Sequence, residues 1–115
     1  MTQLETDIRK MLRKNHITFA DLIKIDGFNG NMDIVFGDEE NIIAWSGVSK
    51  EATEILHRLR GEGVFHYDFN GTSTLLCYAF DGAMLNLPIA KDVGCHDQPH
   101  WLPVELALGP STVLV

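Results

Sequence analysis

Cysteines, long apolar runs and basic side chains are all scarce in this sequence. It holds two cysteines, Cys77 and Cys95, and no apolar run approaches the roughly 20 residues needed to cross a bilayer. Two thiols are too few for a disulfide scaffold, and the mixed-charge N-terminus lacks the apolar core of a signal peptide. We therefore expect a cytoplasmic protein with reduced thiols and no membrane association.

Basic residues are outnumbered by acidic ones, with nine Lys and Arg against 16 Asp and Glu, so the formal net charge is −7. An acidic chain repels phosphate backbones unless its cations gather on one face. This balance disfavours nucleic acid as a partner and favours a protein partner or a homodimer. Hydrophobic residues make up 45% of the chain and charged residues 22%, which is typical of a single globular domain over residues 1–115.

The N-terminal residues predict two short helices that form a helical hairpin. Residues 2–5 read Thr-Gln-Leu-Glu, which is the spacing of a capping box, and an apolar stripe follows in a helix that ends near Asn15. Thr18 can cap a second helix that ends at Leu22 or Ile23. Asp-Gly and Asn-Gly pairs then predict turns.

A β-hairpin and an amphipathic helix are expected next. Residues 32–36 and 42–45 are rich in β-branched and aromatic side chains and flank a polar turn. Ser49 can accept hydrogen bonds from the first amides of the following helix, whose apolar residues share one face. Gly61 or Gly63 can end this helix in a left-handed conformation.

The following segments, 64–69, 74–80 and 84–87, predict an antiparallel meander of three strands. The middle segment is apolar on both faces, which favours a central strand and predicts that Cys77 is a buried core thiol. The tail, residues 101–115, is apolar and should pack on the body or on a partner. Together these elements predict an α+β fold with three helices and about five short strands.

The order of a strand, a helix ending in Leu-x-x-x-Gly-x-Gly and a hairpin resembles the recognition helix and wing of winged-helix proteins, over about residues 42–88. The resemblance implies a DNA-binding regulator whose recognition helix enters the major groove. The candidate partner-binding residues are those on the exposed side of the helix and the tryptophan before it: Lys50, Thr53, His57, Arg58, Arg60 and Trp45. Over residues 49–62, however, three cations are balanced by three glutamates, and DNA binders typically make about 6–10 phosphate contacts.

Cys95, His96 and His100 bring a thiol and two imidazoles into one loop, and zinc takes such ligands. A structural site has four ligands, so a remote residue such as Cys77 or His66 would have to complete it. A catalytic thiol needs a base or a positive neighbour, and no nucleophile motif surrounds either cysteine. An ordinary loop is the simpler interpretation, and we predict no cofactor, no metal ligand and no catalytic residue.

Three functional hypotheses follow from these patterns. The leading one is a small acidic cytosolic interaction or regulatory protein that binds a protein partner or self-associates. The first alternative is a winged-helix DNA-binding transcriptional regulator. The second alternative is a small metal-binding protein or enzyme that uses the loop containing Cys95, His96 and His100.

Overall fold

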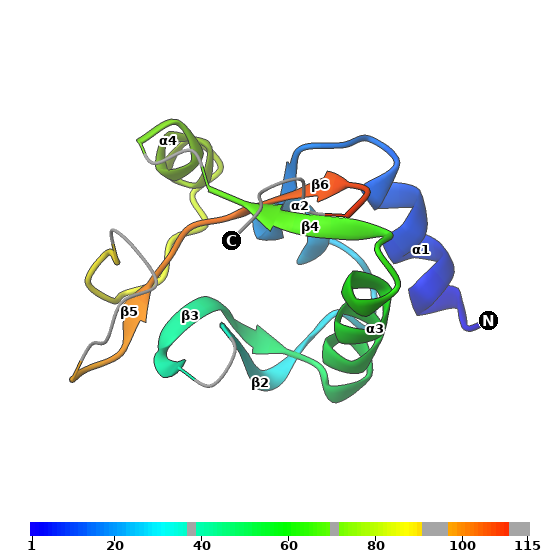
Figure 1. The fold of residues 1–115 in the computed structure, drawn as a ribbon, viewed down its shortest axis with the longest axis horizontal. Coiled ribbons are helices and arrows are strands. Elements are labelled where there is room, and N and C mark those ends of the chain that lie inside the picture. Colours follow the sequence, from blue (N-terminus) through cyan, green and yellow to red (C-terminus); the bar gives the residue numbers. More distant parts are fainter. Residues whose placement is uncertain (37–38, 70–71, 91–96, 111–115) are drawn as a thin grey trace.

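Four helices and two three-stranded sheets make up the residues that the computed structural model describes, which are 1–36, 39–69, 72–90 and 97–110. Helices α1 (Gln3–Leu12) and α3 (Lys50–Gly61) lie at one end of the molecule, and α4 (Thr72–Phe80) lies at the other (Figure 1). The mixture of helices and mostly antiparallel strands confirms the predicted α+β class.

Side-chain caps begin the two N-terminal helices, as the sequence predicts. The Thr2 hydroxyl accepts a hydrogen bond from the amide of Glu5 at 3.2 Å and begins α1. Thr18 begins the short helix α2 (Phe19–Leu22) with a complete capping box, in which the carboxylate of Asp21 accepts from the Thr18 amide at 3.0 Å. The helical pair at the N-terminus is therefore confirmed.

The predicted β-hairpin is also confirmed. Strands β2 (Asn29–Phe36) and β3 (Glu39–Val48) are antiparallel, with Ile34 opposite Trp45. A short strand, β5 (His100–Trp101), runs parallel to β3 and completes this sheet in the order β2-β3-β5.

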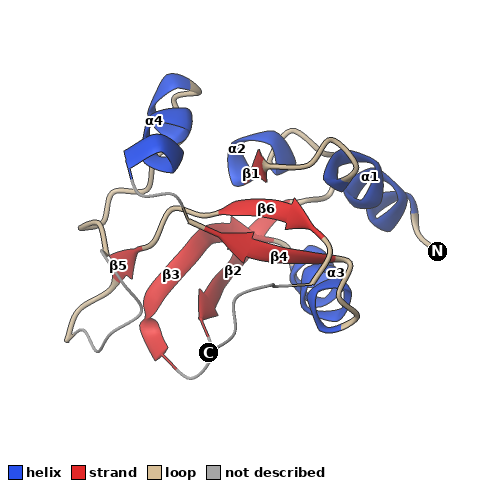
Figure 2. Cartoon of the chain, turned by 45° about the horizontal axis from the view of Figure 1, so that its top comes forward, coloured by secondary structure: helices blue, strands red, loops and turns tan. Residues whose placement is uncertain are grey.

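The second sheet is built from short strands that are far apart in the sequence. Its order is β1-β6-β4, with β1 (Ile17–Thr18) and β4 (Phe65–Asp68) both antiparallel to the central β6 (Glu105–Leu108) (Figure 2). The C-terminal segment therefore supplies a strand to each sheet. Leu102 and Val104, between these two strands, are buried in the core.

Helix α3 begins and ends where the sequence predicts. The Ser49 hydroxyl accepts from the amide of Ala52 at 3.1 Å. Gly63 follows the helix with φ of +76°, a left-handed conformation that glycine adopts without a steric penalty. The buried stripe of this helix consists of Ala52, Ile55, Leu56 and Leu59.

The predicted meander is wrong, because residues 72–80 form α4 rather than a central strand. β-branched and aromatic residues suggested a strand, but tertiary packing overrides that propensity. Thr74 and Tyr78, one helical turn apart, are both buried against the body, whereas Cys77 is exposed and is not the predicted core thiol. β4 pairs with β6 instead of with this segment, so no wing hairpin forms there and the winged-helix resemblance is not confirmed.

Stacked aromatic rings connect the β2-β3-β5 sheet to the helices. Trp45 lies nearly parallel to Phe19, with ring centroids 5.8 Å apart and planes 4° apart, and it stacks on Tyr78 at 5.5 Å. Trp101 contacts both Trp45 and Tyr78 edge-on, and its indole Nε1 donates to the Ala44 carbonyl at 3.2 Å. Trp45 is only 6% exposed, so its side chain belongs to the core.

Candidate functional site

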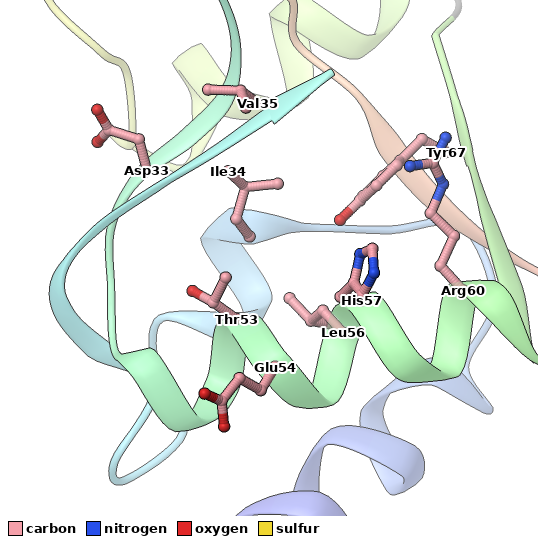
Figure 3. Close-up of a pocket in the computed structure, with 9 residues that line it drawn as sticks. All are labelled: Asp33, Ile34, Val35, Thr53, Glu54, Leu56, His57, Arg60 and Tyr67. Carbon is pink, nitrogen blue, oxygen red and sulfur yellow. The ribbon is translucent and has the colours of Figure 1, made fainter. Parts of the chain in front are cut away.

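A groove of about 470 Å³ lies between α3, β2 and β4 (Figure 3). Its size is within the range of small-molecule sites, about 300–1,000 Å³. Its walls are formed by Asp33, Ile34, Val35, Thr53, Glu54, Leu56, His57, Arg60 and Tyr67. Three of the six predicted candidates, Thr53, His57 and Arg60, are therefore brought together here by their spacing of four and three residues along α3.

The cationic end of the groove is formed by Arg60 and Tyr67. The guanidinium carbon of Arg60 lies 5.1 Å from the centre of the Tyr67 ring, which is a cation–π distance. Among the described residues, Arg60 forms no ion pair and the Tyr67 hydroxyl forms no hydrogen bond. Burial raises the pKa of Tyr67 above its ordinary range, so its hydroxyl stays protonated at neutral pH and can donate a hydrogen bond.

The rest of the groove is apolar along one wall and acidic at its far end. Ile34 of β2 points toward α3 and faces Leu56 across the groove, whereas the side chain of the neighbouring Val35 extends to the other side of the strand (Figure 3). Asp33 and Glu54 lie at the end away from Arg60, and both carboxylates extend out of the groove, that of Glu54 away from β2 and that of Asp33 away from α3 (Figure 3). The groove thus combines an apolar wall with opposite charges at its two ends.

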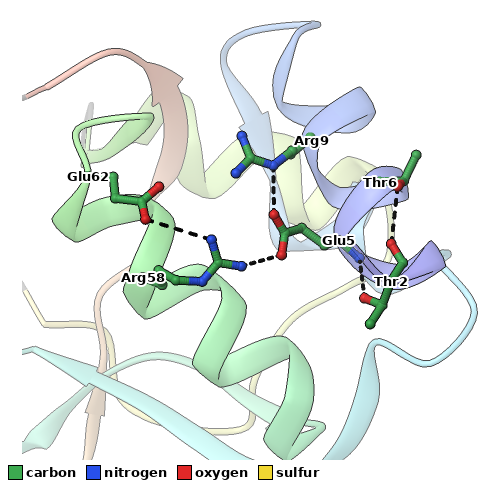
Figure 4. A network of polar contacts seen from close by, with 6 residues as sticks. All are labelled: Thr2, Glu5, Thr6, Arg9, Arg58 and Glu62. Atoms are coloured by element: carbon green, nitrogen blue, oxygen red, sulfur yellow. Dashed lines mark hydrogen bonds and ion pairs between the residues drawn. The ribbon is translucent and has the colours of Figure 1, made fainter.

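Arg58 lies outside this groove and connects α3 to α1. Its guanidinium binds the carboxylate of Glu5 and lies 3.7 Å from Glu62, while Arg9 donates to the same Glu5 at 2.9 Å (Figure 4). The hydrogen bond from Arg9, followed by that from Arg58, lowers the pKa of Glu5 below its ordinary value. These two arginines are therefore partly neutralised by one buried glutamate.

The other predicted candidates are separate from the groove. Lys50 is exposed in the first turn of α3, and Trp45 is buried among aromatic rings. The predicted candidates did not include Tyr67, Ile34 and Val35, which also line the groove. They come from two other strands, and nothing in their local pattern predicts that these strands meet α3.

The proposed metal loop lies largely outside the described residues, because Cys95 and His96 belong to 91–96. His100 is described, and its Nδ1 lies 2.7 Å from the Gln98 carbonyl. The Nδ1 atom of His66 lies 2.9 Å from the carbonyl of Gly109. Within the described ranges, no three His, Cys, Asp or Glu side chains are grouped as metal ligands would be.

A second feature is the apolar outer side of α4. It was not expected from the sequence, because this segment was predicted to be a buried central strand. Leu76 is 61% exposed, Phe80 93% and Met84, just after the helix, 51%. Cys77 is exposed on the same helix. We refer to Leu76, Cys77, Phe80 and Met84 as the α4 surface; it lies at the end of the molecule away from α1 and α3 (Figures 1 and 2).

No known family model matches this sequence, and comparison with curated proteins and with solved structures finds no significant similarity. Among the described helices, none is both long and apolar enough to cross a membrane.

Proposed function

We propose that this chain is a small interaction protein that self-associates through the α4 surface. The observation that carries the proposal is Phe80, which is 93% exposed on a helix whose opposite side is anchored by Tyr78 in the core. An exposed aromatic ring next to other exposed apolar residues is typical of contact surfaces rather than of solvated ones.

The lack of charge on α4 permits a second copy of the chain as the occupant of this surface. Residues 72–80 contain no charged side chain, although the chain as a whole carries a net charge of −7. Two acidic molecules repel each other over most of their surfaces, and an uncharged apolar helix keeps like charges out of the contact itself. A two-fold axis through α4 would place the same residues of both copies against each other.

The size of the surface predicts a weak, concentration-dependent dimer. A phenylalanine ring buries about 150–250 Å², so Phe80 with Leu76 and Met84 offers on the order of 300–400 Å² of apolar area. This is about half of the roughly 800 Å² per partner in a standard stable interface. We expect self-association in the micromolar range or weaker.

The DNA-binding alternative has less support from the described residues. Arg9 and Arg58 share Glu5 as an ion-pair partner, and the exposed Arg60 lies over the ring of Tyr67. These cations therefore do not add up to a free basic face on α3.

Sedimentation equilibrium over a range of concentrations tests the proposal. We expect the wild-type mass to rise with concentration and the Phe80→Asp variant to remain monomeric. Met32→Asp is the matched control, because Met32 is an exposed apolar residue outside α4, at 40% exposure. A wild-type chain that remains monomeric, or a Phe80→Asp variant that associates like wild type, contradicts the proposal.

Cross-linking gives a second, independent readout. In a Cys95→Ser background, Cys77 is the only cysteine, and a symmetric α4 pair brings two copies of it close together. Mild oxidation should then yield a disulfide-linked dimer that the Phe80→Asp substitution suppresses. A dimer that forms without this cross-link would have to use another surface.

A further inference from the structure

We propose that the groove between α3, β2 and β4 binds a small monocarboxylate that carries an aliphatic or aromatic body. This site is separate from the α4 surface, and the inference does not rest on self-association. It rests on the charge, the hydrogen-bond donors and the shape of the groove.

Arg60 supplies the charge complementarity. Glu5 partners both Arg9 and Arg58, whereas the Arg60 guanidinium has only the Tyr67 ring as a recorded partner among the described residues. A guanidinium presents its donors in a fork that matches a carboxylate. Arg60 is exposed, so a ligand can reach its guanidinium.

Further donors lie along the same wall. The Tyr67 hydroxyl has no hydrogen-bond partner among the described residues, and in Figure 3 it extends toward the middle of the groove, near Ile34 and His57. His57 lies between Arg60 and Thr53 on the side of α3 that lines the groove. A carboxylate bound by Arg60 can therefore accept a second hydrogen bond from Tyr67 or from His57.

The apolar wall accommodates the body of the ligand. Arg60 and Thr53 are seven residues apart on α3, so the groove extends about 10 Å along the helix at 1.5 Å per residue. Ile34, Val35 and Leu56 line this length. An extended aliphatic chain or a phenyl-substituted chain fits such a strip, with its carboxylate at Arg60.

The acidic end of the groove selects against a second negative charge. The side chains of Asp33 and Glu54 lie at the end away from Arg60 and extend out of the groove (Figure 3), and Asp33 accepts a hydrogen bond from Ser46. Their negative charges are still close enough to this end to repel a second anionic group placed there. A monoanion with an uncharged tail avoids this repulsion. Dicarboxylates of the same length should therefore bind more weakly than monocarboxylates.

Calorimetric titration with octanoate and 3-phenylpropionate tests the proposal, with octanol as the neutral analogue of octanoate and octanedioate as its dicarboxylate. We expect millimolar or tighter binding of a monocarboxylate and weaker binding of octanol and octanedioate. Arg60→Gln should weaken octanoate binding about 10- to 100-fold, the range for a hydrogen-bonded charge. Tyr67→Phe should weaken it about 3- to 10-fold, the range for a neutral hydrogen bond.

Arg58→Gln is the matched control, because it removes the same charge from the same helix outside the groove. Lys50→Gln is a second control and leaves the α1–α3 ion pairs intact. Thermal unfolding of every variant checks that it is folded. The proposal fails if neither acid binds, if octanol or octanedioate binds as tightly as octanoate, or if Arg60→Gln changes affinity no more than the two controls do.

Discussion

Replacing Tyr78 with phenylalanine removes one oxygen atom from the core and should destabilise the fold strongly. The Tyr78 side chain is fully buried, and its hydroxyl accepts from the Phe19 amide at 3.1 Å while donating to the Val104 carbonyl at 2.7 Å. Phe19 is the first residue of α2, so its amide has no acceptor within the helix. One hydroxyl thus connects α4, the N-terminal helices and the C-terminal segment.

The magnitude follows from the two groups that lose their partner. Phe19 and Val104 are both fully buried, and leaving a buried donor or acceptor unpaired costs about 1–3 kcal/mol per group. Phenylalanine fills nearly the same volume, so the cavity term is small. Because the variant also avoids burying a hydroxyl, we expect a net loss of about 2–4 kcal/mol. For a chain of this length the midpoint of thermal unfolding should fall by about 10 °C.

Urea unfolding of wild type, Tyr78→Phe and Tyr67→Phe measures the effect. Tyr67→Phe is the matched control, since the Tyr67 hydroxyl forms no hydrogen bond with the described residues, and we expect it to change the free energy of unfolding by less than about 0.5 kcal/mol. If Tyr78→Phe destabilises the protein no more than Tyr67→Phe, the hydroxyl does not bridge these segments and the placement of α4 is wrong.

Two further predictions concern the backbone and the response to acid. A Cβ added at Gly30 would lie 2.5 Å from the Ser49 Cα atom, so Gly30→Ala should lower the free energy of unfolding by about 1–3 kcal/mol. A Cβ added at Gly61 meets no atom within 4 Å, so Gly61→Ala should raise it by up to about 1 kcal/mol in helix α3. Chemical denaturation measures both changes. The pKa of Glu5 is lowered in the folded state by Arg9 and a second arginine. The ionised Glu5 carboxylate therefore stabilises the fold fully above the unfolded pKa of about 4.3, and this stabilisation is lost as the pH falls through the lower folded-state pKa. Glu5→Gln should therefore lose less stability than wild type on acidification in urea titrations at several pH values, and an equal loss would contradict the ion-pair network.

Local signals predicted the starts of the first three helices and the hairpin of β2 and β3 well. Thr2, Thr18 and Ser49 each cap the helix that the sequence assigns to them, because a cap depends on atoms within a few residues. The left-handed Gly63 after α3 is local in the same sense. The hairpin of β2 and β3 is similarly local, because two β-prone segments follow each other closely in the sequence.

The partners of the remaining strands could not be predicted, because they are far apart in the sequence. β4 and β6 pair Tyr67 with Leu106, and β1 joins the same sheet by pairing Ile17 with Leu106. No periodicity within either segment encodes this pairing. The C-terminal tail was expected to pack on the body or on a partner, but its role as the centre of a sheet had no local signal.

The groove shows the same division between local and distant information. Thr53, His57 and Arg60 share one side of α3, and helical spacing alone predicts this. The residue that makes Arg60 part of a site is Tyr67, which arrives from β4. Three of the six predicted candidates therefore lie in the groove, and all three come from α3, whereas the residues that face them could be found only in the tertiary structure.

The error over residues 72–80 has the same physical origin as the proposed contact surface. A segment that is apolar on every side matches a buried central strand when it is judged by pattern alone. Among residues 73–80, only Thr74 and Tyr78 are fully buried, and Leu76 and Phe80 remain exposed at 61% and 93%. Both observations are satisfied if α4 is buried on its second side as well, against another molecule. The outer side of α4 is then apolar for the same reason as the inner side, because both sides are buried in a contact. Phe80→Asp tests this, since it should disrupt a contact between molecules without changing a core residue.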